Sequence, residues 1–153
     1  MAVLIAAFVI ALDQWSKYYI GETMSLGTSI PVIANIFHIT YVLNPGAAFG
    51  ILENQTFFFV VIAAIMLGTA IYFYRQIPDG HYLLRWGITL MAGGAVGNVI
   101  DRIKTGYVVD FFDFRIWPVF NIADIAIVSG VIGIICAMTL SSRNNKDQGH
   151  CEK

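Results

Sequence analysis

The chain has 153 residues, of which 58% are hydrophobic and 12% are charged, against roughly 25% charged residues in an average soluble domain. The mean hydropathy of +0.71 leaves too few polar residues to cover a soluble surface, which excludes a water-soluble domain. The net charge of −1 supplies no basic field for nucleic acid, so we expect membrane lipid as the surrounding partner and no nucleic acid.

Four apolar stretches are long enough to cross a hydrocarbon core of about 30 Å, which takes around 20 helical residues. The first has no basic start and no clear small-residue cleavage site, so we expect a retained helix rather than a secretory signal. The predicted fold is an all-α membrane protein, a single integral membrane domain over residues 1–142 with four transmembrane helices. The predicted helices are residues 2–20, 56–74, 83–103 and 119–140.

The segments between the helices differ in character. The loop 21–55 contains two short β-like runs, residues 30–33 and 36–43, separated by turn residues, and it predicts a small folded element outside the membrane. Residues 104–118 carry aromatic and acidic residues side by side, a pattern typical of the membrane–water interface. Residues 141–153 are polar, so we expect them to be disordered, with residues 143–153 as a polar tail outside the membrane domain.

An even number of crossings places both chain ends on the same side of the membrane, and Lys and Arg favour the cytoplasmic side. With cytoplasmic ends, five basic residues lie inside and four outside, and the loop 21–55 contains none. We therefore expect both termini in the cytoplasm. The inner set is Arg75, Arg85, Arg143, Lys146 and Lys153; the outer set is Lys17, Arg102, Lys104 and Arg115.

Under this orientation the charged and amide side chains of the helices gather near the outer face. From Arg85 to Asp101 the third helix rises about 24 Å, at 1.5 Å per residue. A carboxylate facing lipid costs at least ~2.5 kcal/mol, so such residues are expected to face a shared cavity. Three helices each present a polar stripe with helical spacing: Asp13 and Lys17; Asn98, Asp101 and Arg102; Asn121 and Asp124.

Structural explanations compete with functional ones for these residues. Asp13 and Lys17 fit an ion pair within one helix as well as a functional role. For Asp101 we favour a structural clamp with Arg102, because the neighbouring cation keeps the carboxylate ionised. The small residues Gly93 and Gly97, four apart, predict close packing of the third helix against a neighbour.

Two aspartates remain candidates for chemistry. The residue pattern leaves Asp110 open between a loop acid beside Asp113 and a functional residue, whereas Asp124 has no cation in its own helix and favours function. The three histidines fall in different segments, and the two cysteines match neither a disulfide framework nor a metal-ligand spacing, so we expect neither metal nor cofactor.

Two other classes of protein compete with an enzyme. A transporter coupled to protons or cations would contain intramembrane carboxylates, but its polar path would continue to the inner side, and residues 57–74 contain no charged residue. A membrane scaffold without chemistry would explain the glycines but would leave the three polar stripes unexplained. Cleavage of a lipidated precursor peptide would separate the three classes.

Five segments, in order along almost the whole chain, resemble the motif boxes of the lipoprotein signal peptidases, also called signal peptidase II. Five such boxes in register with four hydrophobic spans make a chance match very improbable. Pro45 departs from other members, which often have Thr or Gln there. The segments are Asp13-Gln14-Trp15-Ser16-Lys17, Asn44-Pro45-Gly46-Ala47-Ala48-Phe49, Gly97-Asn98-Val99-Ile100-Asp101-Arg102, Val108-Val109-Asp110-Phe111 and Phe120-Asn121-Ile122-Ala123-Asp124.

The resemblance implies an aspartyl endopeptidase of the bacterial inner membrane, and we expect it to act as a monomer. Such an enzyme removes the signal peptide of a prolipoprotein just before a diacylglyceryl-modified cysteine, near the extracytoplasmic face, and uses no metal. Matched by motif, Asp110 and Asp124 would form the catalytic dyad, and the first loop would form an extracytoplasmic β-cradle. The residues that the resemblance assigns to substrate binding or site support are Asp13, Lys17, Asn44, Asn98, Asp101, Arg102 and Asn121.

Overall fold

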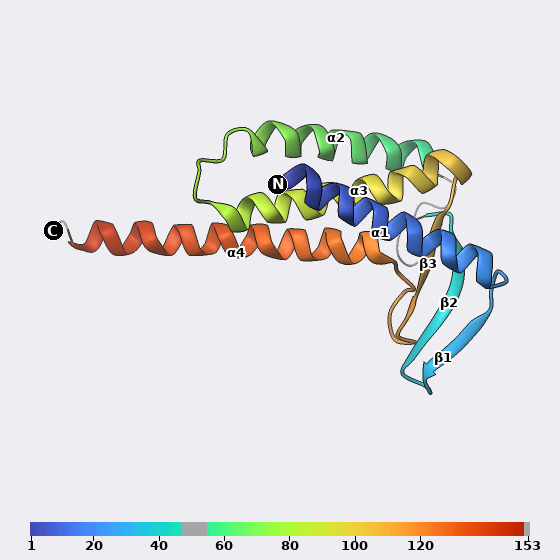
Figure 1. Ribbon diagram of the computed structural model, residues 1–153. Helices are drawn as coiled ribbons and strands as arrows, with labels where there is room; N and C mark the ends of the chain where they lie inside the picture. Colours follow the sequence, from blue (N-terminus) through green and yellow to red (C-terminus); the bar gives the residue numbers. More distant parts are fainter. Residues whose placement is uncertain (47–54, 152–153) are drawn as a thin grey trace.

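The computed structural model describes residues 1–46 and 55–151, with side chains up to residue 141. Within these ranges four helices are long and apolar enough to cross a membrane, which confirms the predicted spans. Helices that follow one another in the sequence run in opposite directions, so both termini lie toward the same end of the bundle (Figure 1). The helices are α1 (Ala2–Thr23), α2 (Thr56–Tyr74), α3 (Tyr82–Thr105) and α4 (Ile122–Cys151).

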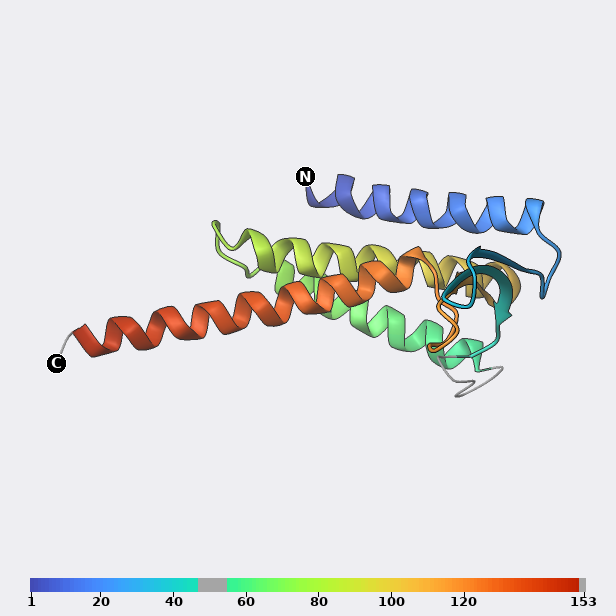
Figure 2. The ribbon, with the colours of Figure 1, turned by 90° about the horizontal axis from the view of Figure 1, so that it is seen from below.

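A three-stranded antiparallel sheet lies at the other end of the bundle (Figures 1 and 2). The strands β1 (Ser29–Ile33) and β2 (Phe37–Asn44) form a hairpin, which confirms the β-like runs in the first loop. The third strand, β3 (Val108–Asp113), pairs with β2 and was not predicted, because an interfacial aromatic pattern does not reveal strand pairing. The sheet therefore joins two segments of the chain that are far apart in sequence.

Helix α3 is the centre of the bundle, because α1, α2 and α4 all pack against it. Its glycines allow this close approach. A methyl group on Gly93 would lie 3.3 Å from the backbone of Ala6 in α1, and one on Gly94 would collide with the carbonyl oxygen of Ala123 in α4. The predicted packing role of Gly93 and Gly97 is confirmed, and Gly94 adds a second packed face.

The ends of α4 differ from the prediction. The helix begins at Ile122 rather than at residue 119, because Phe120 forms an antiparallel bridge with Phe112 of β3 and so extends the sheet. The prediction of a disordered tail after Ser141 is wrong for the backbone of residues 142–151, which continues α4 to Cys151. Neither Pro nor Gly occurs between Ser141 and Gln148, and an established helix extends at low cost.

Candidate active site

The polar stripes of α1, α3 and α4 meet beside β2 and β3, at the sheet end of the bundle. Among the described residues, the fully or nearly fully buried side chains include Asp13, Lys17, Asn98, Asp101, Asp110 and Asn121. Such a concentration of buried polar groups is stable only if they satisfy one another by hydrogen bonds. The structure brings together all the site residues named from the sequence, and their contacts divide into two connected clusters.

The first cluster is built around Asp110, which β3 places in the interior with 3% of its surface exposed. In the register of β2 and β3, Asn44 pairs with Val108, two residues from the aspartate. The side-chain nitrogen of Asn44 donates to Asp110 Oδ2 at 2.9 Å, and that of Asn121 donates to Asp110 Oδ1 at 2.7 Å. Both carboxyl oxygens of Asp110 therefore accept an amide hydrogen bond.

Asp124 lies in the first turn of α4 and takes part in a reciprocal cap of that helix. The backbone N–H of Asn121 donates to Asp124 Oδ2 at 3.1 Å, and the backbone N–H of Asp124 donates to Asn121 Oδ1 at 3.0 Å. Asn98 of α3 donates to the other carboxyl oxygen, Asp124 Oδ1, at 2.8 Å. Asp124 is half-buried, so water can reach it.

Two asparagines connect the aspartates. Asn121 donates both to Asp110 and to Asn98 Oδ1, the latter at 3.1 Å, while Asn98 donates to Asp124. Burial and, to a smaller extent, the charge of Asp124 together raise the pKa of Asp110 to about 7, against the opposite effect of the amides of Asn44 and Asn121. Near neutral pH, Asp110 is therefore able to hold a proton.

The second cluster is centred on the ammonium group of Lys17, which is only 4% exposed. Lys17 Nζ lies 2.8 Å from both Asp13 Oδ2 and Asp101 Oδ2, and it donates to Asn98 Oδ1 at 2.9 Å. The ion pair expected within α1 is present, but it also joins α1 to α3. Because an ammonium group can only donate, it fixes the oxygen of Asn98 toward itself and the amide nitrogen toward Asp124.

The aspartates of this second cluster hold other elements of the site. Asp13 Oδ1 accepts the backbone N–H of Ala123 at 2.9 Å, which places a negative charge at the N-terminus of α4. Asp101 Oδ2 accepts the backbone N–H of Val109 at 3.3 Å, next to Asp110. Both carboxylates therefore position the backbone beside one member of the aspartate pair.

The predicted clamp between Asp101 and Arg102 is wrong, because Lys17 rather than Arg102 is the cation paired with Asp101. The guanidinium of Arg102 instead donates to the carbonyl oxygen of Gly46 at 3.0 Å and lies 4.7 Å from the ring centre of Phe59 in α2. Consecutive residues of a helix point about 100° apart, so Asp101 and Arg102 face different partners. Arg102 thus holds the chain where it leaves β2.

Sequence reasoning did not select Gln14, which belongs to the same network. Its side-chain nitrogen donates to Asp101 Oδ1 at 2.7 Å, and its oxygen accepts from Lys104 at 3.2 Å. Its spacing could have identified it, because Gln14 lies three residues before Lys17 and therefore on the same polar side of α1. Of the second motif box, residues 47–49 lie outside the described residues.

Asp113 is separate from the aspartate pair, although it is on the same strand as Asp110. It forms an ion pair with Arg115 at 3.1 Å and accepts a hydrogen bond from Thr40 at 2.8 Å. Asp110 has no such cation within ion-pair distance among the described residues. The site therefore combines two carboxyl groups with different surroundings, a combination suited to simultaneous acid and base chemistry.

Comparison with known proteins identifies the same family as the motif boxes, the signal peptidases II. The family model described as "Signal peptidase (SPase) II" matches residues 5–140. A lipoprotein signal peptidase of Moorella thermoacetica is 53% identical over 133 residues, covering 87% of this chain and 88% of the relative. One of Staphylococcus aureus is 43% identical over 151 residues, covering 96% and 93%.

Solved structures give the same result. One described as a bacterial membrane enzyme is similar with a TM-score of 0.86 at 43% identity, over 94% of this chain and 90% of the other. A second has a TM-score of 0.79 at 44% identity, over 90% and 91%. The chain, a membrane protein with four spanning-capable helices, belongs to the signal peptidase II family.

Proposed function

We propose that this chain is an intramembrane aspartyl endopeptidase that cuts the signal peptide from a prolipoprotein just before its diacylglyceryl-modified cysteine. Membership of the signal peptidase II family supports the substrate class. The observation that carries the mechanism is the pair Asp110 and Asp124, which come from a strand and a helix and are joined through the amides of Asn98 and Asn121.

In this mechanism the two carboxyl groups share one proton, because two neighbouring carboxylates do not both ionise readily. The ionised member removes a proton from water as the oxygen attacks the scissile carbonyl, and the protonated member donates its proton to the carbonyl oxygen. Collapse of the tetrahedral intermediate breaks the C–N bond, and the departing nitrogen receives a proton from the pair. The reaction requires no metal.

The remaining polar residues support this pair. Asn44, Asn98 and Asn121 hold the carboxyl groups, and Asp13 and Asp101 hold the backbone beside them. Lys17 neutralises the two supporting aspartates. Arg102, through its bond to the Gly46 carbonyl oxygen, holds the entrance to the first loop. None of these supporting residues is required to exchange a proton with the substrate.

The position of the site fits a lipidated substrate. Each acyl methylene transferred into lipid contributes about 0.8 kcal/mol, so the diacyl chains stay in the bilayer and the peptide bond lies near the interface. We place the sheet end on the extracytoplasmic side of a bacterial inner membrane and both termini in the cytoplasm. This orientation follows from the absence of Lys and Arg in residues 21–55.

The central test uses Asp110→Asn and Asp124→Asn, which preserve size and remove the acid–base group. Each purified variant, acting as a monomer on a lipidated precursor peptide, should lose about 10²- to 10⁴-fold in cleavage rate. Asp113→Asn is the matched control on the same strand, because Asp113 bonds Thr40 and Arg115 instead of the pair, and it should stay active. Normal cleavage by either dyad variant would end the proposal.

Two further measurements test whether Asp101 is catalytic and whether the reaction depends on a metal. Asp101→Asn should lower the yield of folded protein, and a well-folded but inactive variant would move Asp101 into the catalytic set. Activity should also be unaffected by a chelator. Loss of activity in chelator with recovery on adding a divalent ion would favour a metal-dependent reaction, and absence of cleavage would leave the transporter and scaffold classes.

A further inference from the structure

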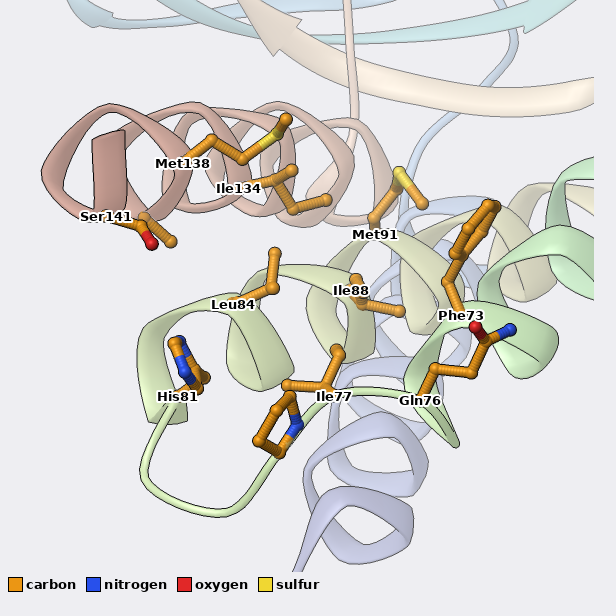
Figure 3. Close-up of a pocket in the computed structure, with 12 residues that line it drawn as sticks. Phe73, Gln76, Ile77, His81, Leu84, Ile88, Met91, Ile134, Met138 and Ser141 are labelled. Carbon is orange, nitrogen blue, oxygen red and sulfur yellow. The ribbon is translucent and has the colours of Figure 1, made fainter. Parts of the chain in front are cut away.

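An open cavity of about 950 Å³ lies at the end of the bundle opposite the sheet. It is bounded by the end of α2, the first turns of α3 and the middle of α4, whose side chains converge on it in Figure 3. Its walls are mainly apolar, and its polar side chains include Gln76, His81 and Ser141, two of them near the α2–α3 loop. The proposed reaction makes no use of this cavity. The apolar residues include Phe73, Leu84, Ile88, Met91, Ile134 and Met138.

The length of the cavity matches one leaflet of a bilayer. Met91 of α3 and His81, the residue just before α3, are ten residues apart, or about 15 Å at 1.5 Å per residue. The hydrocarbon core of a membrane is about 30 Å thick, so one leaflet contributes about 15 Å. The apolar part of the cavity therefore has the depth of a single lipid acyl chain, and its polar residues lie where that chain would join its headgroup.

The charge around this polar end identifies the headgroup that fits. The α2–α3 loop and its flanks contain two arginines, Arg75 and Arg85, against a single acidic residue, Asp79, which leaves a net positive charge at this end of the bundle. Arg75 lines a separate pocket beside α1, and His81 is the one basic residue that lines the 950 Å³ cavity among the described residues. Asp79 is almost fully exposed and lies 3.0 Å from Arg85, whose guanidinium also donates to the Ile77 carbonyl oxygen at 2.7 Å. Basic residues near a membrane surface attract anionic lipid.

Two occupants have the required apolar length: the apolar segment of a signal peptide and a phospholipid of the surrounding bilayer. A signal peptide begins with a basic region, which would meet the net positive charge of Arg75, Arg85 and Asp79 in and beside the α2–α3 loop. An anionic headgroup would meet opposite charges. We propose that the cavity binds one acyl chain of an anionic phospholipid, with the phosphate beside His81 and the α2–α3 loop. This inference rests on the membrane-spanning helices and not on the proposed chemistry.

Bound lipid would complete the packing between α2 and α4. The small apolar cluster at this end consists of Ala70, Ile77 and Ile88, with Met91 and Ile134 packed around it. Ala70 is the one buried residue of α2. A chain seated between Phe73 and Met138 would add an apolar surface that the protein itself does not supply. Binding should therefore raise the thermal stability of the bundle.

The test measures thermal unfolding of the full chain in detergent, titrated with phosphatidylglycerol or with phosphatidylcholine that has the same acyl chains. The anionic lipid should raise the Tm saturably and at lower concentration. Ala137→Phe fills the cavity and should weaken the apparent affinity at least about tenfold, since excluding two methylenes has that effect. Ala64→Phe, on the exposed face of α2, is the matched control.

Met138→Trp provides a second filling variant at a position that is largely exposed and tolerant of size. His81→Gln should reduce the preference for phosphatidylglycerol over phosphatidylcholine. Equal effects of the two lipids, or an unchanged response in both filling variants, would overturn the proposal in favour of a non-specific lipid shell. A Tm rise caused by a signal-sequence peptide but not by phosphatidylglycerol would assign the cavity to substrate instead.

The effect of lipid on the Tm should not depend on the two catalytic aspartates proposed above. Asp110→Asn should respond to phosphatidylglycerol as the unmodified chain does, because Asp110 is at the sheet end. Loss of cleavage with an intact lipid response would support both proposals. Normal cleavage with an intact lipid response would overturn the dyad alone.

Discussion

Helices α2 and α3 both have the length and hydropathy of a membrane span, but they differ in how much of their surface is buried against other helices. Helix α2 has the higher mean hydropathy, 2.3 against 1.3, and 6% of an 18-residue apolar stretch of α2 is buried, against 44% of such a stretch of α3. Helix α3 contacts all three other helices and contributes Asn98, Asp101 and Arg102 to the candidate site. High hydropathy therefore marks contact with lipid, and the less apolar helix is the centre of the bundle.

The physical reason is that lipid tails are as apolar as leucine, so burying leucine against another helix gains little. Association inside a membrane depends instead on close packing at small residues and on hydrogen bonds between helices. Helix α3 has both, through Gly94 against Ala123 and through Asp101 with Lys17. In α2, Gly68 has no heavy atom within 4 Å of the position of an added methyl group.

The largest expected effect follows from Lys17→Met. It leaves Asp13 and Asp101 buried without their cation and should lower the free energy of unfolding by about 3–5 kcal/mol. Lys104→Met is the control, because Lys104 is exposed and its bond to Gln14 lies at the surface. Chemical denaturation in detergent micelles measures both, and equal stability of the two variants would contradict the role given to Lys17.

The next effect compares glycines of the two helices. Gly94→Ala should destabilise the bundle by about 1–3 kcal/mol, because the new methyl group would collide with the Ala123 carbonyl oxygen and lie 2.9 Å from Ile127 Cγ1. Gly68→Ala should be neutral or stabilise by up to about 1 kcal/mol, since Ala is the better helix former. Thermal unfolding checks the pair, and a stabilising Gly94→Ala would disprove the close packing.

A smaller effect should appear in the pH dependence of cleavage. The proposed reaction needs the shared proton, so kcat/KM should fall as pH rises past the Asp110 pKa of about 7. Asn44→Ala removes a hydrogen bond that lowers this pKa; the pKa should rise and the alkaline limb should move to higher pH. Thr40→Val on the same strand removes hydrogen bonds to Asp113 and Ser29, neither of which contacts Asp110, and should leave the limb in place. A shift of the alkaline limb to lower pH in Asn44→Ala would contradict the role given to Asp110.

The smallest effect concerns the one ring contact between α2 and the candidate site that the described residues show. Phe59→Leu removes the ring beside the Arg102 guanidinium, an interaction worth about 0.5–1 kcal/mol. Cleavage should fall by no more than about fivefold, because the bond from Arg102 to the Gly46 carbonyl oxygen remains. Steady-state kinetics on a lipidated peptide would measure this loss of cleavage. A loss as large as that of Asp110→Asn would show that α2 contributes as much to the candidate site as the dyad does.

Much of the fold was accessible from the sequence because its signals are local. Runs of about 20 apolar residues predict spans, and polar residues three or four apart on a helix predict a common face. These rules predicted the four helices and the stripes that contain Asp13, Asn98 and Asp124, and two β-like runs separated by turn residues predicted the hairpin. The motif boxes selected Asp110, which composition and spacing alone left open.

The tertiary structure decided which of these groups meet. Strand β3 exists because β2 offers it hydrogen bonds across more than sixty residues of sequence, and that pairing places Asn44 against Asp110. Asp101 pairs with Lys17 of another helix rather than with its neighbour Arg102, and Gln14 joins the same cluster. The cavity between α2 and α4 likewise depends on how three helices diverge. Sequence periodicity fixes the direction of each side chain on its own element, whereas its partner depends on the packing of elements that are distant in sequence.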